Sequence, residues 1–324
     1  MRAIRIHALD GLDGLSLEEV AAPRPGPGEA RIAIHAAGVN FADTLVVAGL
    51  YQHKPDLPFT PGMEAAGEVI EVGDGVSRVK PGDRVVATTR HGAYAEEVVA
   101  DAEHLVAIPD RMDFATAAAF PICYGTAHLA LTHRTQLRPG EVLLVLGAAG
   151  GVGLGAVEVG KALGATVVAC ASSDEKLAVA QSRGADHMIN YTTENIRERV
   201  KALTGGADAV FDPVGGDAAQ QALRTLNYEG RLITLGFASG EIPKFAANYL
   251  LVKNISVIGY SFSTYRYERP QVMRHTLDEL CRWYKEGRLR PLVGMTFPLE
   301  ETRAALETLR DRKAMGKVVV MVRD

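Results

Sequence analysis

The sequence predicts an α/β protein with two parts, a barrel-like β domain and a domain built on a doubly wound parallel sheet. Three observations predict this architecture. Short strand patterns separated by Pro-Gly and Gly-Asp turns fill the first third of the chain. Strand and helix patterns alternate strictly from Glu141 onward. The length of 324 residues and the hydrophobic content of 47% suffice for two cores.

The β domain is predicted over residues 1–122. Its strand patterns are AIRI, ARIAIHAAGV, GEVIEVG, RVVATT and AEEVVA, and an Ala-rich helical stretch begins at about Asp113. Pro-Gly pairs at Pro25, Pro61 and Pro81 mark turns between these strands. Many short strands with such turns are typical of a barrel or sandwich.

The last part of the chain, residues 261–324, is expected to complete the β domain. Here the patterns predict a helix from about Arg269 to Gly287, a helix from Leu299 to Arg312 and a strand from Val318 to Val322. A strand that follows a completed six-stranded sheet needs another sheet to pair with. We therefore expect this tail to return to the first domain.

The second domain is predicted over residues 123–260. It opens with a buried strand, Val142 to Leu146, then a glycine-rich turn and a helix that stops at Gly164. The remaining five predicted strands are Thr166–Ala171, His187–Tyr191, Ala209–Asp212, Arg231–Leu235 and Ile255–Tyr260. The helices between the later strands are expected to end at Gly184, Gly205 and Gly230.

The turn after the first strand has the G-x-G-x-x-G pattern of dinucleotide-binding folds, with Ala148 in the first place. Gly150 is expected to let the backbone approach a pyrophosphate, and Gly153 to let the helix pack on the strand. The positive end of that helix favours an anion. The predicted pyrophosphate site comprises Ala149, Gly150, Gly151 and Val152.

The end of the second strand favours NADPH over NADH. NAD-binding folds place an acidic residue there, and this chain has Ala171, Ser172 and Ser173 instead. Ser172 leaves room for a 2′-phosphate, and Lys176 offers a counter-charge. The alternative is that Asp174 caps the next helix and Lys176 is a solvated helix residue. NADH is the alternative cofactor if the Asp174 carboxylate reaches a ribose hydroxyl.

Composition argues for a small-molecule partner. The net charge of −4 and the lack of a long basic run disfavour nucleic acid, and no apolar stretch is long enough to insert in a membrane. Three widely spaced cysteines indicate a reducing compartment, so we expect a cytoplasmic protein. The apolar edge strand Ile255–Tyr260 favours a homodimer through the sheet edge.

Several strings resemble the quinone oxidoreductases that lack zinc, the zeta-crystallin-like branch of the medium-chain dehydrogenase/reductase superfamily. They span almost the whole chain in the family's order: AAGVNFADTLVVAGLY, PGMEAAGEV, VKPGDRV, AAGGVGLGAVEVGKALGA, INY, GFASGEIP and GKVV. The resemblance implies a GroES-like β-barrel catalytic domain, a six-stranded Rossmann domain, NADPH as cofactor and a homodimer.

The resemblance also implies site residues. Asn40, Asp43 and Tyr51 would line the acceptor side as catalytic residues, although Asn40 and Asp43 also suit a turn and Tyr51 also suits loop packing. Leu45 stands where some relatives have a second tyrosine, which puts a tyrosine role there in doubt. The implied cofactor residues beyond the glycine turn are Thr126, Ser172, Lys176, Tyr191, Gly236, Phe237, Phe262 and Lys317.

Zinc is not expected. Zinc alcohol dehydrogenases of this superfamily carry Gly-His-Glu where this chain has Gly62-Met63-Glu64, and a thioether is a poor zinc ligand. We therefore predict hydride transfer from NADPH to a quinone or an α,β-unsaturated carbonyl. An enoyl-thioester or acrylyl reductase, or a non-catalytic NADPH-binding protein, remains an alternative. The pair Tyr249 and Lys253 matches a short-chain reductase motif, but those enzymes resemble a single Rossmann domain.

Overall fold

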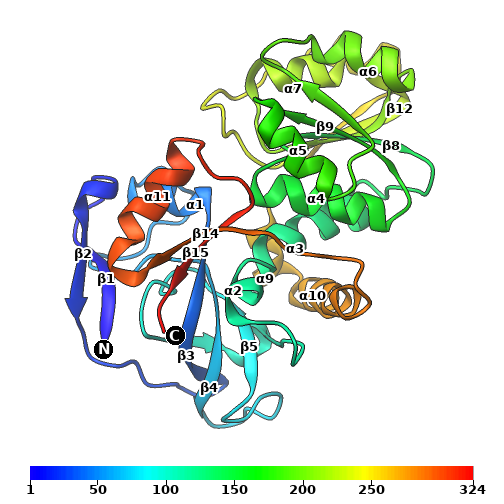
Figure 1. Ribbon diagram of the computed structural model, residues 1–324. Coiled ribbons are helices and arrows are strands. Elements are labelled where there is room, and N and C mark those ends of the chain that lie inside the picture. The colour runs from blue at the N-terminus through cyan, green and yellow to red at the C-terminus, as the bar shows by residue number, and fades with distance from the viewer. Residues whose placement is uncertain (324) are drawn as a thin grey trace. The chain divides into compact units, whose positions relative to one another are not determined.

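The computed structural model describes residues 1–323, which form two compact units. The first unit comprises Met1–Ile122, Arg269–Cys281 and the residues from Pro291 onward. The second comprises Cys123–Glu268 and Arg282–Arg290. Both ends of the chain belong to the first unit (Figure 1).

The first unit is built on a seven-stranded sheet. Six strands follow the order β14-β15-β3-β4-β5-β7, and β6 pairs with β3. A separate antiparallel pair joins β1 and β2. This arrangement confirms the predicted GroES-like β domain. The strands are β1 (Arg2–Ile6), β2 (Leu15–Glu19), β3 (Glu29–Val39), β4 (Glu64–Val72), β5 (Arg84–Thr88), β6 (Glu97–Asp101), β7 (Leu105–Ala107), β14 (Val293–Pro298) and β15 (Lys317–Met321).

The tail returns to this sheet, although residues 261–268 and 282–290, which the sequence predicts to complete the first domain, belong to the second unit. β15 pairs antiparallel with the second half of β3, where Val318 lies opposite Val39 and Val320 opposite Ala37. β6 covers the first half of the same edge of β3. The helices of this unit are η1 (Leu12–Gly14), α1 (Phe41–Val47), η2 (Ala102–His104), α2 (Phe114–Ala118), η4 (Leu299–Glu301) and α11 (Thr302–Arg310).

The second unit contains a six-stranded parallel sheet with the order β10-β9-β8-β11-β12-β13. This order confirms the predicted doubly wound sheet, because the chain reverses direction across the sheet between β8 and β11. Ligands of such sheets bind at the carboxyl ends of the strands at this reversal. The strands are β8 (Val142–Leu146), β9 (Thr166–Ala171), β10 (His187–Asn190), β11 (Ala207–Asp212), β12 (Leu226–Thr234) and β13 (Ser256–Gly259).

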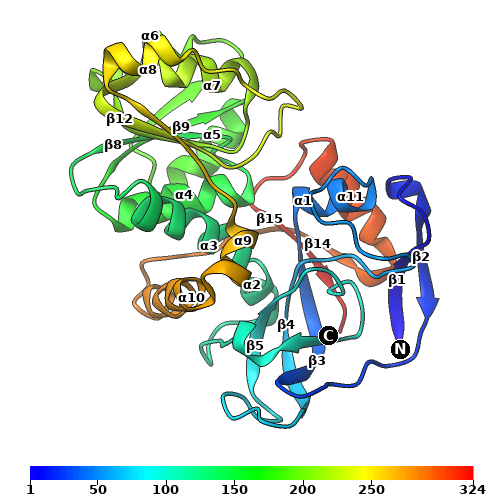
Figure 2. The same cartoon turned by 180° about the vertical axis from the view of Figure 1, so that it is seen from behind.

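Helices cover both faces of this sheet (Figures 1 and 2). Right-handed crossovers place α4 and α5 on one face and α6 and α7 on the other. Their bounds are α4 (Gly151–Ala162), α5 (Asp174–Ser182), α6 (Ile196–Thr204) and α7 (Gly216–Leu223). The other helices are α3 (Pro121–Leu129), the π-helix η3 (Ala130–Arg134), α8 (Ala247–Lys253) and α9 (Phe262–Glu268). α10 (Pro270–Lys285) lies in the first unit up to Cys281 and in the second unit from Arg282.

One helix end differs from the sequence prediction. Gly205 ends α6 with a positive φ of 78°, as expected. Gly230 does not end a helix, because α7 stops at Leu223 and β12 already begins at Leu226. β12 has an early segment that pairs Leu226 with Ala207 before a register shift, and Gly230 lies within this irregularity, since regular pairing resumes at Arg231. A glycine inside a strand marks such a bulge as readily as a helix end.

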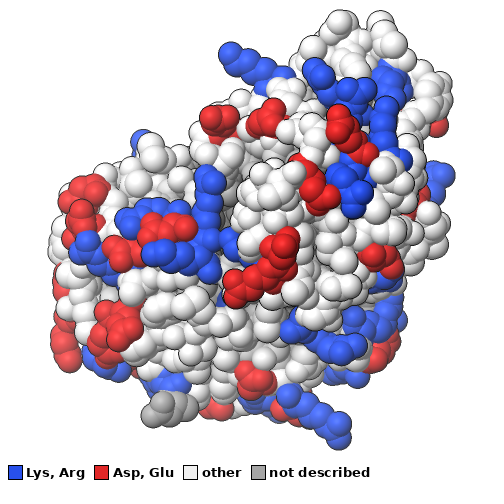
Figure 3. All heavy atoms as spheres, turned by 45° about the horizontal axis from the view of Figure 1, so that its top comes forward, with Lys and Arg blue, Asp and Glu red and all other residues white. Residues whose placement is uncertain are grey.

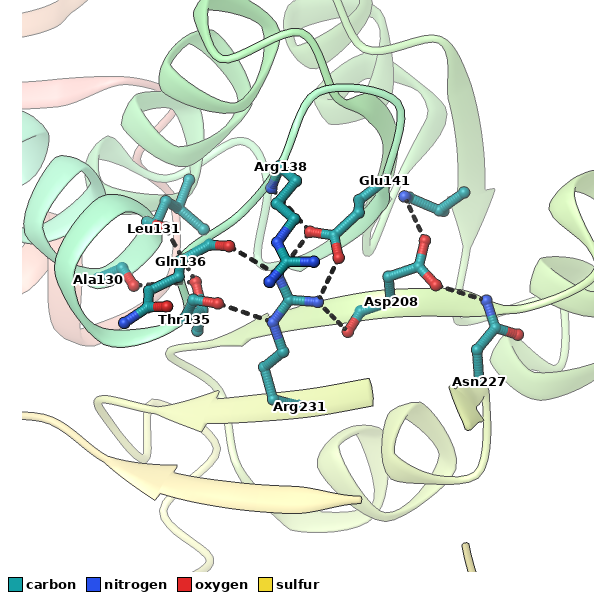
Figure 4. A network of polar contacts seen from close by, with 10 residues as sticks. Ala130, Leu131, Thr135, Gln136, Arg138, Glu141, Asp208, Asn227 and Arg231 are labelled. Atoms are coloured by element: carbon teal, nitrogen blue, oxygen red, sulfur yellow. Dashed lines mark hydrogen bonds and ion pairs between the residues drawn. The ribbon is translucent and has the colours of Figure 1, made fainter. Parts of the chain in front are cut away.

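A polar network ties the amino-terminal edge of the second sheet together (Figure 4). The Arg231 guanidinium of β12 donates to both carboxylate oxygens of Glu141, at 2.9 and 2.5 Å. It also donates to the backbone carbonyls of Thr135 and Asp208, at 2.8 and 3.0 Å. Arg231 therefore holds the segment before β8 against β11 and β12, at the edge opposite the glycine-rich turn.

Surface charge is mixed. On the face shown in Figure 3, Lys and Arg side chains alternate with Asp and Glu and form no extended area of one sign. Within residues 1–323, no helix is long and apolar enough to cross a bilayer.

Candidate functional site

The glycine-rich turn links β8 to α4 at the carboxyl edge of the second sheet. Gly150 is the N-cap of α4, and Gly151 and Val152 are its first residues. Ala149 is buried below the turn, with 2% of its surface exposed. The helix therefore directs its free backbone N–H groups and the positive end of its dipole to the place predicted for a pyrophosphate.

Gly150 and Gly153 have different reasons to lack a side chain. A Cβ on Gly153 would lie 2.1 Å from the carbonyl oxygen of Gly147, so only glycine lets α4 pack this closely on the strand. A Cβ on Gly150 would meet no protein atom closer than Gly147 O at 3.6 Å. The space beside Gly150 is therefore open to a ligand.

The carboxyl ends of β9 and β10 bring Ser172, Lys176 and Tyr191 together. The Lys176 ammonium lies 3.3 Å from Ser172 Oγ. Tyr191 follows β10, and its backbone N–H donates to the carbonyl of Ala171 at 3.1 Å. The Tyr191 side chain is 37% exposed. A cation and a hydroxyl at this position suit a phosphate group.

The alternative role of Asp174 as a helix cap is wrong. Ser173 is the N-cap of α5, and its Oγ accepts a hydrogen bond from the backbone N–H of Lys176. Asp174 is the first helical residue, and its carboxylate accepts a hydrogen bond of 2.9 Å from the amide of Asn190. Ser173 takes the N-cap position because its short hydroxyl reaches the third backbone N–H of the helix from an extended backbone.

The loops after β11 and β12 lie side by side at the same edge of the sheet. Backbone N–H groups of Ala238 and Ser239 donate to the carbonyls of Pro213 and Val214, at 3.1 and 2.9 Å. This pairing places the predicted residues Gly236 and Phe237 over the β11 loop, and Phe237 is 39% exposed. Two other predicted cofactor residues of this unit, Thr126 on α3 and Phe262 at the start of α9, are buried.

Asp212, which the sequence analysis did not select, shapes the β11 loop. Its Oδ1 accepts hydrogen bonds from the backbone N–H groups of Val214 and Gly215, at 2.9 and 2.8 Å. The residue is fully buried, and burial raises the pKa of its carboxyl group. Its signal in the sequence is a lone acid at the end of an apolar strand, before Pro-Val-Gly-Gly.

The first unit contains a buried polar network around Glu64. Lys317 Nζ donates to Glu64 Oε1 at 2.5 Å and to Asn40 Oδ1 at 2.7 Å. Asn40 Nδ2 donates to the same Glu64 oxygen at 2.9 Å and to Gly38 O at 3.4 Å. The exposed fractions of Glu64, Lys317 and Asn40 are 0%, 4% and 7%. The structure thus joins two predicted residues to one that the sequence analysis considered only as part of a lost zinc motif.

Asp43 belongs to a second, adjoining buried group. Its Oδ2 accepts hydrogen bonds from Tyr94 OH at 2.7 Å and from the backbone N–H of Asn40 at 2.9 Å. Asn40 is the N-cap of α1, so the expected turn at these residues is present as a helix start. Burial raises the pKa of Asp43 from 3.8 to about 6, although Tyr94 and the Asn40 N–H act in the opposite direction.

Tyr51 lies in the loop after α1. Its side chain is half-buried and packs against the hydrophobic core of the first unit. Met63, at the position that carries histidine in zinc enzymes, is 7% exposed and belongs to the same core. Among residues 1–323 no group of three or more His, Cys, Asp or Glu side chains is placed to hold a metal ion.

Two sequence families match the two parts of the chain. The family described as the alcohol dehydrogenase GroES-like domain matches residues 26–110. The family described as zinc-binding dehydrogenase matches residues 151–278. The first range contains β3 to β7 of the first unit, and the second range contains β9 to β13 of the second unit.

Individual relatives match over nearly the full length. Quinone oxidoreductase-like protein 2 of Bos taurus is 43% identical over 313 residues, which are 95% of this chain and 89% of the relative. The quinone oxidoreductase of Thermus thermophilus, solved also in complex with NADPH, is 36% identical with a TM-score of 0.88, covering 99% of this chain and 100% of that one.

The quinone oxidoreductase of Escherichia coli, solved in complex with NADPH, is 32% identical with a TM-score of 0.92. That match covers 99% of this chain and 100% of the other. Identity, coverage and fold agree across both units. This chain therefore belongs to the quinone oxidoreductase branch of the medium-chain dehydrogenase/reductase superfamily.

Proposed function

We propose that this protein is an NADPH-dependent oxidoreductase that transfers hydride to a quinone or an α,β-unsaturated carbonyl compound. The observation that carries the proposal is the carboxyl end of β9, where Lys176 Nζ lies 3.3 Å from Ser172 Oγ and the strand ends without an acidic residue. This arrangement suits the 2′-phosphate that distinguishes NADPH from NADH. The NADPH complexes of the two bacterial relatives support the same choice.

In this proposal the residues of the second unit bind the cofactor. Ala149, Gly150, Gly151 and Val152 hold the pyrophosphate, and Ser172, Lys176 and Tyr191 surround the 2′-phosphate. NADPH supplies the hydride when it is bound. Thr126, Gly236, Phe237 and Phe262 border the nicotinamide half, and Lys317 remains the one proposed cofactor residue of the first unit.

We also propose that the reaction needs no zinc. The ammonium of Lys317 lies against Glu64 and Asn40, so a positive charge already neutralises the buried carboxylate. Met63 offers a thioether in place of an imidazole, and catalytic zinc generally has three protein ligands. Quinones and enones accept hydride at carbon without metal polarisation, so this chemistry fits a site built from hydrogen bonds.

Asn40, Asp43 and Tyr51 are proposed to act on the acceptor side. Both Nδ2 contacts of Asn40 stay inside the buried network, so its geometry favours an orienting role. Tyr51 is the better candidate to donate a hydrogen bond to the acceptor oxygen, since its side chain is half-buried. Hydride and one proton from water together convert a quinone to a hydroquinone, or an enone to the saturated ketone.

Rapid mixing of the protein with NADPH and an acceptor tests this proposal. The acceptors are benzoquinone, naphthoquinone, a small enal and a crotonyl thioester, and the absorbance of reduced nicotinamide reports turnover. We expect turnover with quinone or enal and a preference for NADPH over NADH. Turnover with the thioester alone would assign an enoyl-thioester reductase. Tight NADPH binding without any turnover would assign a non-catalytic binding protein.

The Lys176→Ala variant tests the choice of cofactor. Loss of a charge-assisted hydrogen bond, which contributes about 1.5–3 kcal/mol, should weaken NADPH binding roughly 10- to 100-fold. The affinity for NADH should stay within about twofold, because NADH lacks the phosphate. Lys201→Ala, on the exposed side of α6, is the matched control. Equal losses for both cofactors would contradict the assignment.

We propose further that two copies associate through β13. This strand pairs with β12 on one side only and forms the edge of the sheet. Large apolar side chains nearby in the chain are strongly exposed, with values of 77% for Leu251 and 76% for Val252 on α8. Such an edge favours pairing with a copy of itself. Light scattering should show a dimer, and Ile258→Lys should convert it to a folded monomer.

A cytoplasmic location is also proposed. Cys123, Cys170 and Cys281 are buried, and no disulfide occurs within the described residues. Thiols of this kind suit a reducing compartment. Fractionation of the source cells with an antibody to the protein would test the location.

A further inference from the structure

We infer that Glu64 is a positioning residue of the proposed reaction, and the inference rests on that reaction. Its carboxylate reaches three separate parts of the first unit. Oε1 accepts hydrogen bonds from Lys317 of β15 and from Asn40 at the end of β3, at 2.5 and 2.9 Å. Oε2 accepts a hydrogen bond of 2.8 Å from the backbone N–H of Ile122 at the start of α3.

The network selects one orientation of the Asn40 amide. Its oxygen faces the Lys317 ammonium, which can only donate, and its nitrogen faces the Glu64 carboxylate, which can only accept. The reverse orientation would place the NH₂ group against an ammonium and the oxygen against a carboxylate. Glu64 and Lys317 therefore fix the orientation of Asn40, which is proposed to have an orienting role on the acceptor side.

The backbone around Glu64 is built to admit its carboxylate. A Cβ on Gly38 would lie 2.5 Å from Glu64 Oε1 and 2.3 Å from the carbonyl oxygen of Ala118. Any larger residue at this point of β3 would displace the carboxylate or the strand. Glycine at position 38 therefore lets both the Ala118 carbonyl and the Glu64 carboxylate approach β3.

Stability alone does not explain the charges. The residues beside the network on the same strands, Val39, Ala65 and Val318, are apolar and at most 1% exposed. A buried ion pair often stabilises a protein no more than apolar residues of similar volume, because both charges must lose their water. A packed apolar group would fill this place equally well, so the ion pair points to a functional requirement.

Four variants test the inference: Glu64→Gln, Lys317→Met, the double variant, and Glu68→Gln as the control. Glu68 lies on β4 as well, but it is partly exposed and outside the network. For each variant we would measure kcat and KM for the acceptor, the Kd for NADPH by fluorescence, and thermal midpoints between about pH 6 and pH 10.

Glu64→Gln should lower kcat roughly 10- to 100-fold and change the NADPH Kd by less than about twofold. It removes the carboxylate that Lys317 contacts and leaves Asp43 as the nearby acid, so its thermal midpoint should rise toward that of the wild type as pH increases and the buried amine loses its proton. The double variant removes both charges. It should recover the thermal midpoint and lose this pH dependence, yet keep the low kcat when NADPH is saturating by its measured Kd.

A double variant that recovers both the midpoint and kcat would show that the network only fills space, and would overturn the inference. Wild-type kcat in Glu64→Gln would overturn it as well. In either case the wild type still turns over, so the proposed function stands. A wild type that reduces no acceptor in the panel would refute the proposed function, and the positioning role with it. Glu68→Gln should match the wild type within about twofold.

Discussion

Gly150 and Gly153 show that nearby glycines can be required for different reasons, one for ligand binding and one for packing. Gly153 lacks a side chain because a Cβ would collide with Gly147 O, whereas the space beside Gly150 is unfilled by protein. The backbone of Gly150 has φ −76° and ψ 165°, which alanine adopts freely. Substitution by alanine should therefore weaken NADPH binding at Gly150 and lower the stability of the fold at Gly153.

We expect Gly150→Ala to keep the thermal midpoint within about 2 °C and to weaken NADPH binding at least roughly tenfold, because the new methyl group meets the pyrophosphate. Gly153→Ala should lower the free energy of unfolding by about 2–4 kcal/mol, since α4 must move off the strand. Calorimetry measures the stability of each variant, and fluorescence titration measures its affinity for NADPH. Equal effects on stability would refute this division.

Asp43 gives the first unit a pH-dependent stability. Its pKa of about 6 in the folded state exceeds the ordinary 3.8, mainly because the buried carboxylate loses water. The folded protein therefore holds this proton more tightly than the unfolded chain. The contribution of Asp43 to stability is fully present below about pH 4 and falls as pH rises through 6, by on the order of 2–3 kcal/mol.

Asp43→Asn does not titrate, so it should lack this loss. The thermal midpoint of the variant minus that of the wild type should become more positive from about pH 4 to pH 7. Midpoints measured by calorimetry in steps across this range test the prediction. Asp74→Asn, in an exposed turn, is measured in parallel. A difference that stays constant across the range would contradict the raised pKa.

At the scale of the elements, the Arg231–Glu141 network at the amino-terminal edge of the second sheet stabilises the fold and does not bind a ligand. The side chains of Arg231 and Glu141 are 13% and 23% exposed, and their contacts lie at the edge opposite the glycine turn. Arg231→Met should lower the stability of the second unit by about 2–4 kcal/mol, because three backbone carbonyls lose their Arg231 donor and Glu141 loses its counter-charge.

Trp283, the sole tryptophan of the chain, belongs to the second unit and provides the measurement. Its ring lies edge-on to His128 at 5.1 Å, so its fluorescence in urea should follow the unfolding of this unit. Combining Glu141→Gln with Arg231→Met should restore part of the stability that Arg231→Met loses. Arg197→Met on the exposed side of α6 should change stability by less than about 0.5 kcal/mol. If Arg231→Met lowers stability no more than the Arg197→Met control does, the structural role of Arg231 is refuted.

The elements that the sequence predicts are those with strong local patterns. The six strands of the parallel sheet are apolar runs between turns, and the predicted bounds differ from the observed ones by a few residues. β2 and β14 escape prediction because their residues are mostly partly or fully exposed, so neither shows a clear alternation. Gly230 is misassigned because a glycine in a strand looks like a helix stop.

The candidate sites also divide into local motifs, which the sequence predicts, and contacts between distant residues, which it does not. The glycine turn and the Ser172–Lys176 pair are local motifs, so the sequence predicts their place in the fold. The bond between Glu64 and Lys317 joins residues 253 positions apart. A buried carboxylate and a buried ammonium leave no periodic signal, and only the pairing of β15 with β3 brings them together.

At the scale of the whole molecule, the integrity of the first unit depends on the tail. β15 lies between β14 and β3, and Val318, Val319 and Val320 are at most 1% exposed. Ending the chain after Arg312 should expose the edge of β3 and leave Glu64 without Lys317, so most of the expressed protein should be insoluble. Ending it after Val322 keeps β15 and should preserve the soluble yield. Equal soluble yields would contradict this dependence.

The pairing of β15 with β3 also has a consequence for synthesis on the ribosome. The Ala36–Val39 half of β3 emerges early, but its partner strand is translated almost three hundred residues later. Throughout that interval the nascent chain has an unpaired strand edge, and the Glu64 carboxylate is without Lys317. The parallel sheet of the second unit, continuous in sequence through its six strands, can form before the first unit closes. We therefore expect chaperone binding to concentrate on the amino-terminal third of the nascent protein.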